Sequence, residues 1–195
     1  SGVLTFNSSP DYATKSSYSA TVTASDGANV STQDITVTIT DVDDTAPNFT
    51  SSSTFSTEEN QTAIGTVTAS DVDTDNSSIT FNISGSELSI GPSTGVLTFN
   101  SAPDYETKAS YTATVTASDG SNSATQDISV NVTNLNDNTP AITSDATFSA
   151  AENQTSIGAV TATDADGDTL SYSLSGTDVS SMSINSSSGV LTFNS

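Results

Sequence analysis

Acidic side chains carry most of the chemistry that this sequence offers, and they gather in segments that recur along the chain. A first group consists of Asp11, Asp41, Asp43, Asp44, Asp71, Asp73 and Asp119. A second group consists of Glu59, Asp104, Glu106, Asp137, Asp164 and Asp166, with Asn134, Asn136 and Asn138. Carboxylate and amide oxygens are the ligands that hard divalent cations prefer.

Bringing these carboxylates together without a cation would be costly. Two unit charges about 4 Å apart interact by about 4 kcal/mol at an effective dielectric constant of about 20. Several such pairs would exceed the stability of a small domain, about 5–15 kcal/mol. Calcium accepts about six to eight oxygen ligands, whereas magnesium demands a tighter octahedron and sheds water reluctantly. The sequence therefore predicts bound Ca²⁺, with solvated turn aspartates as the simpler alternative for any one position.

Two acidic segments begin like the loop of an EF-hand, namely D-V-D-T-D-N from Asp71 and D-A-D-G-D-T from Asp164. That loop needs Gly at its sixth position and Glu at its twelfth. Asn76 and Asn82 stand there in the first segment, and Thr169 and Ser175 in the second. The EF-hand interpretation is therefore rejected.

Composition excludes several classes of function. Lys and Arg number 2 against 23 Asp and Glu, so the formal net charge is −21. Such a chain repels nucleic-acid backbones and anionic membrane surfaces. The absence of Cys and His removes disulfides, Cys/His zinc sites and His-based catalytic triads. No apolar run reaches membrane-spanning length, and no signal peptide is visible.

The acidic segments belong to an internal repeat. S-G-V-L-T-F-N-S, or the same segment with Thr first, surrounds Gly2, Gly95 and Gly189, at steps of 93 and 94 residues. A period of this length suits one seven-stranded β-sandwich of the immunoglobulin-like kind. We expect a complete repeat over residues 45–137, the C-terminal part of another over 1–44, and the N-terminal part of a third over 138–195. The chain is expected to begin within a repeat.

Alternating apolar and polar residues predict the strands that position the acids. Ile35, Val37 and Ile39 alternate with Thr, as do Ile128, Val130 and Val132, and a similar row runs from Tyr111 to Ala117. This period indicates half-buried antiparallel strands. Further strands are expected near residues 64–70, 78–84, 87–90 and 96–99, with turns at the two Ser-Asp-Gly segments and at Gly91-Pro92. The expected fold class is all-β.

Five of these motifs, in this order, resemble the cadherin family. They are Glu59-Asn60 and Glu152-Asn153; Asp71-Val72-Asp73 and Asp164-Ala165-Asp166; Asp104-Tyr105-Glu106; Asp26-Gly27 and Asp119-Gly120; and the linkers 41–47 and 134–140. The resemblance covers the whole chain and implies a linear array of tandem seven-stranded Greek-key β-sandwiches. It implies up to three calcium ions at each junction, bound by the earlier repeat, the linker and the later repeat. Glu152 joins the implied ligands on this ground.

Some positions depart from the family pattern. Ala13 stands where the next repeat has Glu106, so the first junction lacks one implied ligand. Thr45 replaces the final Asn of the first linker, and Asn134 replaces the first Asp of the second linker. The Ser/Thr-rich, Cys-free composition resembles bacterial cadherin-like repeats of large surface proteins.

The function expected from these features is a calcium-stiffened stalk or filament segment of an extracellular or cell-surface adhesin. Its partners would be calcium ions and neighbouring repeats, or copies of the same chain, arranged head to tail. The alternatives are a carbohydrate-binding sandwich, with Tyr12, Tyr18, Tyr105 and Tyr111 as platforms, and a homophilic recognition module. Because the carboxylates recur in each repeat, metal cages account for them better than a single active site, and no enzyme is expected.

Overall fold

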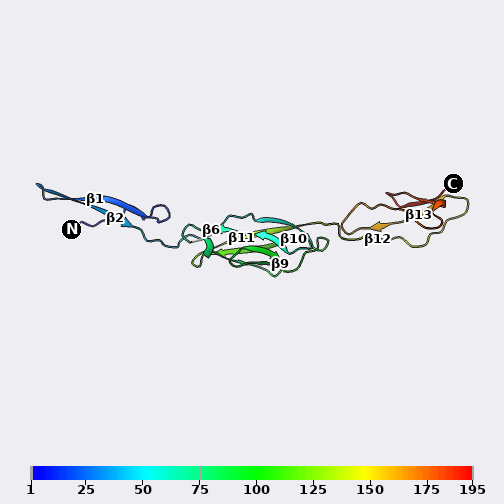
Figure 1. Cartoon of the computed structure of the whole chain (residues 1–195), viewed down its shortest axis with the longest axis horizontal. Coiled ribbons are helices and arrows are strands. Elements are labelled where there is room, and N and C mark those ends of the chain that lie inside the picture. Colours follow the sequence, from blue (N-terminus) through cyan, green and yellow to red (C-terminus); the bar gives the residue numbers. More distant parts are fainter. Residues whose placement is uncertain (1, 75, 195) are drawn as a thin grey trace. The chain divides into compact units, whose positions relative to one another are not determined.

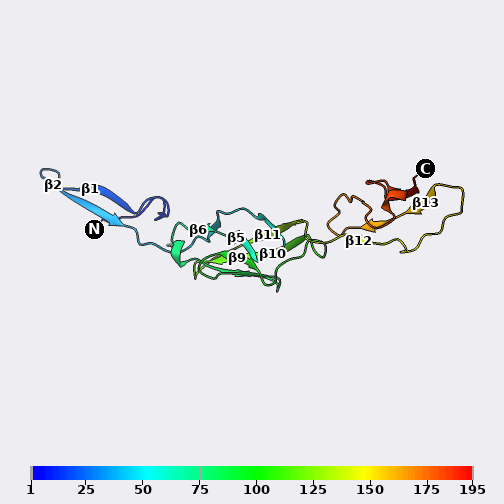
Figure 2. The same ribbon diagram turned by 45° about the vertical axis from the view of Figure 1, so that its right-hand side comes forward.

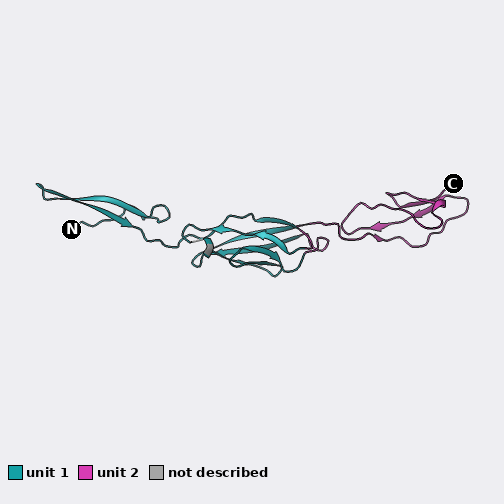
Figure 3. Cartoon of the chain, in the orientation of Figure 1, with its two compact units in different colours: residues 1–57, 61–102, 110–131 teal, residues 58–60, 103–109, 132–195 magenta. Residues whose placement is uncertain are grey.

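The computed structural model describes residues 2–74 and 76–194. The described fold is all-β, with two short 3₁₀ helices, η1 (Asn76–Ser78) and η2 (Val179–Ser181). The chain divides into two compact units, one of residues 1–57, 61–102 and 110–131 and the other of residues 58–60, 103–109 and 132–195 (Figure 3). In the described part of the chain, no helix is long and apolar enough to cross a membrane.

The central part of the chain contains one complete β-sandwich. One sheet has four strands in the order β4 (Thr54–Glu58), β11 (Ser123–Thr133), β10 (Ser110–Ser118) and β7 (Thr80–Ile83). The other has three, in the order β5 (Ala63–Thr66), β9 (Val96–Phe99) and β8 (Leu88–Ile90). Strands β9, β10 and β11 are labelled in Figure 1, and Figure 2 also labels β5. A short pair, β3 (Asn48–Phe49) with β6 (Ala69–Ser70), accompanies the two sheets. These two sheets provide the seven expected strands.

The core of this sandwich is formed by the inward rows that the alternation predicts. Val115, Ala117, Ile128, Val130 and Val132 are buried on one sheet, and Leu97, Phe99 and Leu88 on the other. Tyr111 packs edge-on against Phe99, with ring centroids 4.9 Å apart. Burial of these small rows against each other is the main favourable term that a sandwich of this size can offer.

Two expected strands have different bounds in the structure. The strand expected over residues 64–70 is divided into β5 and β6, and at the division the Val67 N–H donates to Gly95 O (2.9 Å). A Cβ at Gly95, whose φ is +65°, would lie 2.0 Å from Val67 O, so this approach requires glycine. The strand expected over 78–84 begins only at Thr80, after η1. Strand β4 was missed because Phe55 is its only large apolar residue.

The N-terminal part of the chain has one regular element, the hairpin of β1 (Ser17–Ser25) and β2 (Val30–Thr38), drawn in blue in Figure 1. The β1–β2 hairpin has nine residue pairs, from Ser17↔Thr38 to Ser25↔Val30. The β10–β11 hairpin has the nine corresponding pairs, from Ser110↔Asn131 to Ser118↔Ser123, so the two hairpins have the same register. Phe6 packs on Tyr18 at 5.1 Å, as Phe99 packs on Tyr111.

The C-terminal part of the chain repeats the other half of the sandwich. Strands β13 (Ser156–Ala159), β16 (Val190–Phe193) and β15 (Met182–Ile184) form a three-stranded sheet, and β12 (Ala141–Ile142) pairs with β14 (Ala162–Thr163). The β13–β16 pair is irregular between Ser156 and Gly158, as the β5–β9 pair is between Ala63 and Gly65. The internal repeat of the sequence is therefore also a repeat of backbone structure.

Candidate metal centres

The first acidic cluster joins three segments that are far apart in the sequence. Asp43 lies in the linker after β2, Asp71 follows β6, and Asp119 follows β10. Each is half-buried, and each offers a carboxylate oxygen that lies within 4.8 Å of the other two. The ends of two strands and one linker thus place three negative charges together.

The hydrogen bonds of this cluster leave two carboxylate oxygens without a donor. Asp71 Oδ1 accepts the N–H groups of Asp73 (2.8 Å) and Thr74 (3.0 Å), and Asp119 Oδ1 accepts those of Ser121 (2.7 Å) and Asn122 (2.6 Å). Among the described residues, three buried side-chain atoms have no hydrogen-bond partner, and two of them are Oδ2 of Asp71 and Oδ2 of Asp119. A buried, unpaired carboxylate oxygen is costly unless a cation binds it.

Neighbouring polar groups orient the third member of the cluster. Asn122 Nδ2 donates to both Asp43 O and Asp43 Oδ1 (3.2 Å each), and Thr74 Oγ1 donates to Asp43 Oδ2 (3.2 Å). Asn122 was not predicted as part of the site. A signal for it was present in the sequence, because Asn122 lies three residues after Asp119 just as Asn29 lies three residues after Asp26.

A hollow of about 450 Å³ is lined by four further predicted ligands, Asp11, Asp41, Asp44 and Asp73. Asp73 Oδ2 accepts the N–H groups of Thr45 (2.9 Å) and Asp44 (3.3 Å). Thr14 Oγ1 donates to Asp11 Oδ2 (2.6 Å), and this bond, with the backbone bonds from Thr14 and Ala13, holds the pKa of Asp11 below its usual value. These four acids share a cavity but do not form a tight three-carboxylate cluster.

The second cluster is built around Glu59, which is only 3% exposed. Its carboxylate lies within 4.8 Å of those of Glu106 and Asp137. Glu59 Oε2 accepts the Tyr105 N–H and Oε1 accepts the Leu135 N–H, both at 2.8 Å. The two backbone donors orient this buried carboxylate beside the second linker.

Asn138 lies among the carboxylates of this cluster. Its Nδ2 donates to Asp137 Oδ1 and Asp166 Oδ1 (2.9 Å each) and lies 3.4 Å from Glu106 Oε2. Its N–H donates to Asp166 Oδ2 at 2.8 Å. Asn60, at φ 64°, donates its side-chain amide to Asp137 Oδ2. The two predicted acids Asp137 and Asp166 are therefore linked through one amide group.

Two pKa shifts describe the electrostatics of this cluster. The pKa of Glu106 is raised, first by desolvation and then by the negative charges of Glu59, Asp166 and Asp104. The pKa of Asp166 is lowered, chiefly because the Asn138 side chain donates to its ionised form. The cluster thus contains one carboxylate that resists ionisation and one that is stabilised as an anion, and a bound cation would favour the anionic form of both.

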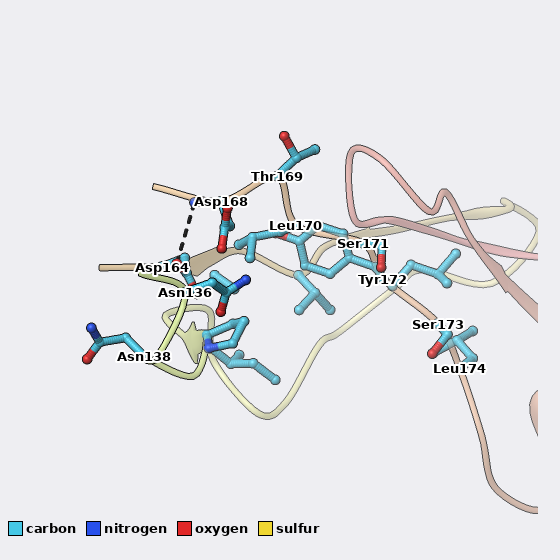
Figure 4. Close-up of a pocket in the computed structure, with 15 residues that line it drawn as sticks. Asn136, Asn138, Asp164, Asp168, Thr169, Leu170, Ser171, Tyr172, Ser173 and Leu174 are labelled. Carbon is cyan, nitrogen blue, oxygen red and sulfur yellow. Dashed lines mark hydrogen bonds between the residues drawn. The ribbon is translucent and has the colours of Figure 1, made fainter. Parts of the chain in front are cut away.

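A third group consists of Asp164, Asp166 and Asp168, with carboxylate oxygens within 4.8 Å of one another. Asp164 Oδ1 accepts the N–H groups of Asp166 (3.1 Å) and Asp168 (3.5 Å), the second of which is drawn in Figure 4. Asp168 was not predicted as a ligand, although it is the third acid of the segment that was compared with an EF-hand. Asn136 and Asn138 line a hollow together with Asp164 and Asp168.

Two predicted ligands lie outside both the clusters and the hollows described above. Asp104 accepts hydrogen bonds from Thr107 N (3.2 Å) and Thr107 Oγ1 (3.0 Å), and it contributes to the raised pKa of Glu106 through its charge. Glu152 is exposed, and no three-acid cluster of the described residues includes it.

Comparison with known proteins identifies the family. Residues 53–133 match the cadherin domain family. The protocadherin-like wing polarity protein stan of Drosophila melanogaster is 35% identical over an alignment of 161 residues that covers 73% of this chain and 4% of that protein. Human protocadherin Fat 4 is 35% identical over 195 residues, covering 90% of this chain and 4% of its own length. The chain thus spans a small fraction of these relatives.

Solved structures give the same family. The extracellular cadherin domains 3–6 of protocadherin gamma B2 superpose with a TM-score of 0.78 at 29% identity, covering 94% of this chain and 51% of that one. The EC3-6 cis-dimer structure of protocadherin gamma B7 gives 0.80 at 28% identity, with the same coverage. The cadherin domain is a structural and adhesive module of ectodomains rather than an enzyme. Residues 53–133 are a cadherin domain, within a chain that has the all-β fold of cadherin ectodomain repeats.

Proposed function

We propose that this chain is an extracellular adhesion segment in which calcium ions at the junctions between cadherin-type repeats hold neighbouring repeats in a fixed orientation. The observation that carries the proposal is the pair of buried, donor-free oxygens at Asp71 and Asp119, two acids whose carboxylates cluster with that of Asp43. The proposed repeats are residues 1–44, 45–137 and 138–195. The junctions are then the linkers 41–47 and 134–140.

The donor set favours calcium over other metals. All proposed ligands are carboxylate or amide oxygens, and the sequence has no Cys or His. Hard oxygen donors in an irregular, carboxylate-rich arrangement suit calcium, whereas zinc prefers nitrogen and sulfur ligands. Modules of this extracellular type bind calcium with a dissociation constant of about 10⁻⁴–10⁻³ M.

The first junction would bind calcium through two groups of acids. Asp43, Asp71 and Asp119 form one, with Asp73 beside them, and Asp11, Asp41 and Asp44 surround the neighbouring hollow. The second junction would use Glu59, Asp104, Glu106, Asp137, Asn138 and Asp166, with Asn136 and Asp164 adjacent. Glu152 corresponds to Glu59, which lies at the junction that follows the complete repeat, so Glu152 would serve the junction that follows its own repeat.

The adhesive role is proposed from the family. The protocadherin gamma B2 structure consists of extracellular cadherin domains, and the gamma B7 structure is a cis-dimer. A stalk or filament of repeats, joined head to tail with neighbouring repeats or copies, is consistent with the 93-residue period from Gly2 to Gly95. A bacterial surface origin rests on composition alone, since the relatives named above are animal proteins.

Thermal unfolding and calorimetry test the proposal directly. The chain should unfold at a lower temperature in a calcium chelator than in millimolar calcium, and the double substitution Asp71→Asn/Asp119→Asn should remove the calcium sites of the first cluster. Asp127→Asn is the matched control, because Asp127 is an exposed acid in β11 that bonds Thr114 Oγ1 outside every cluster. An unfolding temperature that is the same with chelator and with calcium would contradict the proposal.

A further inference from the structure

Asn122 lies beside the first acidic cluster without being one of its acids. It is half-buried and stands in the loop between β10 and β11, three residues after Asp119. Its Nδ2 donates to two oxygens of Asp43, the backbone O and the side-chain Oδ1, each at 3.2 Å. Because an amide NH₂ group has two hydrogens, both side-chain donors of Asn122 are used on the first linker.

The loop between β1 and β2 has the same internal hydrogen bonds as the loop between β10 and β11. Asp26 N–H donates to Asn29 O at 3.2 Å, and Asp119 N–H donates to Asn122 O at 3.3 Å. In both loops, Oδ1 of the Asp accepts the N–H groups of the residues two and three positions later. The side chains of the two loops can therefore be compared position by position.

The side-chain amide of the Asn has a different partner in each loop. Asn29 Nδ2 donates to Asp26 Oδ2 at 3.2 Å, which shows that an amide at this place can reach the second oxygen of its own Asp. Asn122 Nδ2 donates to Asp43 instead, and Asp119 Oδ2 is buried without a donor among the described residues. The position of the Asn122 amide thus decides whether Asp119 Oδ2 is accessible to a cation.

Asp43 needs such a contact more than its two neighbours do. Asp71 and Asp119 belong to the complete repeat, where backbone N–H groups orient their carboxylates. Asp43 belongs to the linker, and like charges this close repel it from the other two acids. Asn122 donates to Asp43 Oδ1 and Thr74 Oγ1 donates to Asp43 Oδ2, so both carboxylate oxygens of the linker acid are held by uncharged donors.

We infer that Asn122 is a positioning residue of the first junction, whose amide holds Asp43 in the cluster and thereby leaves Asp119 Oδ2 open to a cation. When the linker acid moves away, the same amide turns to Asp119 Oδ2 and occupies it, as Asn29 does at Asp26. Docking of the linker and accessibility of the metal-binding oxygen are thus coupled through one amide. The inference rests on the proposed function, because the cation is the calcium proposed for this junction.

The coupling predicts that one substitution has opposite effects in two backgrounds. Asn122→Leu removes the amide and nearly keeps the side-chain size. In the unaltered chain the amide makes two hydrogen bonds when it holds Asp43 and one when it occupies Asp119. Its loss should therefore weaken calcium binding by about 2–10-fold, the effect of one net hydrogen bond.

The sign should reverse when Asp43 is replaced by Ala. The amide then keeps only the backbone O at position 43 as a linker acceptor, and the charged Oδ2 of Asp119 is the stronger acceptor of the two. In this background the amide competes with the cation, so Asn122→Leu should strengthen calcium binding by about 2–10-fold. A residue that merely stabilised the loop would have the same sign in both backgrounds.

Calcium titration of the full chain, followed by NMR at the Gly120 amide, measures the affinity of the first junction, because Gly120 directly follows Asp119. Signals of the buried Val130 verify that each variant is folded. Asn122→Ala should act like Asn122→Leu in both backgrounds, whereas a packing role would make Ala weaker than Leu. Asn29→Leu is the matched control, since Asn29 has the same place in the β1–β2 loop, and it should leave the Gly120 titration unchanged.

A crystal structure of the Asp43→Ala variant in chelator gives a second readout, which does not depend on affinity. It should show Asn122 Nδ2 within hydrogen-bond distance of Asp119 Oδ2. An amide that stays on the linker, or an Asn122→Leu substitution that weakens calcium binding in both backgrounds or changes it in neither, would overturn the inference. A Gly120 signal of the unaltered chain that does not respond to millimolar calcium would contradict the proposed function itself, and the inference with it.

Discussion

Desolvation and the neighbouring negative charges both oppose the ionisation of Glu106. Its carboxylate should therefore destabilise the fold without metal and contribute to calcium binding when metal is present. Because its folded pKa is raised, the ionised side chain destabilises the metal-free fold, and the penalty disappears as pH falls through that raised value. Glu106→Gln should therefore raise the unfolding temperature in chelator and reduce the further rise that calcium produces. Thermal unfolding at neutral pH, with and without calcium, measures both effects.

The matched control for this substitution is Glu87→Gln, since Glu87 lies outside the acidic clusters. Compared with Glu106→Gln, Glu87→Gln should have little effect on the unfolding temperature in chelator. It should also have little effect on the rise in unfolding temperature that calcium produces. If Glu106→Gln behaved like Glu87→Gln in both conditions, the electrostatic description of the second cluster would be wrong.

Thr45 in the first linker stands where the second linker has Asn138, and this difference predicts unequal calcium affinities. Thr45 and Asn138 both donate a backbone N–H to an acid, Asp73 at 2.9 Å and Asp166 at 2.8 Å, but only Asn138 adds an amide that bonds Asp137 and Asp166. Loss of such supporting hydrogen bonds commonly lowers metal affinity by about 10–100-fold. Asn138→Thr should weaken the second junction by this order, and Thr45→Asn should strengthen the first, as measured by calorimetric titration.

The same amide gives a pH readout that is independent of metal. Asn138 holds the pKa of Asp166 low, so the stability that this contact contributes is complete above the unfolded value, about 4, and is lost as pH falls through the lower folded value. In chelator, Asn138→Thr should therefore shift acid unfolding to higher pH. An unchanged acid midpoint would show that the amide does not stabilise the anion.

At the scale of strands, the segment V-L-T-F-N-S occurs in two places that differ in burial, so the same substitution should have different effects on the free energy of unfolding. Leu97 in β9 is 0% exposed, while Leu4, in the same sequence, is 65% exposed. Truncating a buried Leu to Ala typically costs about 2–5 kcal/mol, whereas an exposed substitution stays within about 0.5 kcal/mol. Leu97→Ala should lower the free energy of unfolding by the larger amount and Leu4→Ala by the smaller, as measured by urea unfolding.

Sequence periodicity predicted the strands that have long alternating rows, namely β2, β10 and β11, because buried and exposed positions there differ clearly in polarity. It missed β4, since the sheet pairing that forms this strand comes from β11 and not from an apolar row of its own. It also could not anticipate the division of β5 from β6, because that depends on the close approach of Gly95 to Val67 O.

The acids of the candidate site could be predicted from the sequence, but the hydrogen bonds that each carboxylate oxygen accepts could not. Repeat spacing and acid clustering predict Asp43, Asp71 and Asp119 as ligands of one junction, and the structure brings these three carboxylates together. Which carboxylate oxygens lack donors follows only from the three-dimensional hydrogen-bond pattern, in which Asp71 Oδ1 and Asp119 Oδ1 take the backbone bonds. Asn122 and Asp168 were missed although both recur with the period, because the motifs considered ended at Asp119-Gly120 and at Asp164-Ala165-Asp166.

At the scale of the whole molecule, calcium should convert a repelling acidic chain into one with fixed junctions. The chain carries a formal charge of −21 and no Cys, so two introduced cysteines can be spin-labelled without interference. Labels at Thr32→Cys and Ser86→Cys report across the first junction, because Thr32 lies in β2 and Ser86 between β7 and β8. The distribution of distances between the labels should be broad in chelator and narrow in calcium.

The control pair for this measurement is Ser86→Cys with Ser121→Cys, both of which lie in the complete repeat. Since this sandwich is held by its buried core, the width of the control distribution should be nearly the same in both conditions. Junction labels that stay equally broad in calcium would show that bound metal does not fix the repeats, even if calorimetry detects binding. A narrowing confined to the junction pair would instead locate the stiffening at Asp43, Asp71 and Asp119, where the metal-free fold leaves buried charge uncompensated.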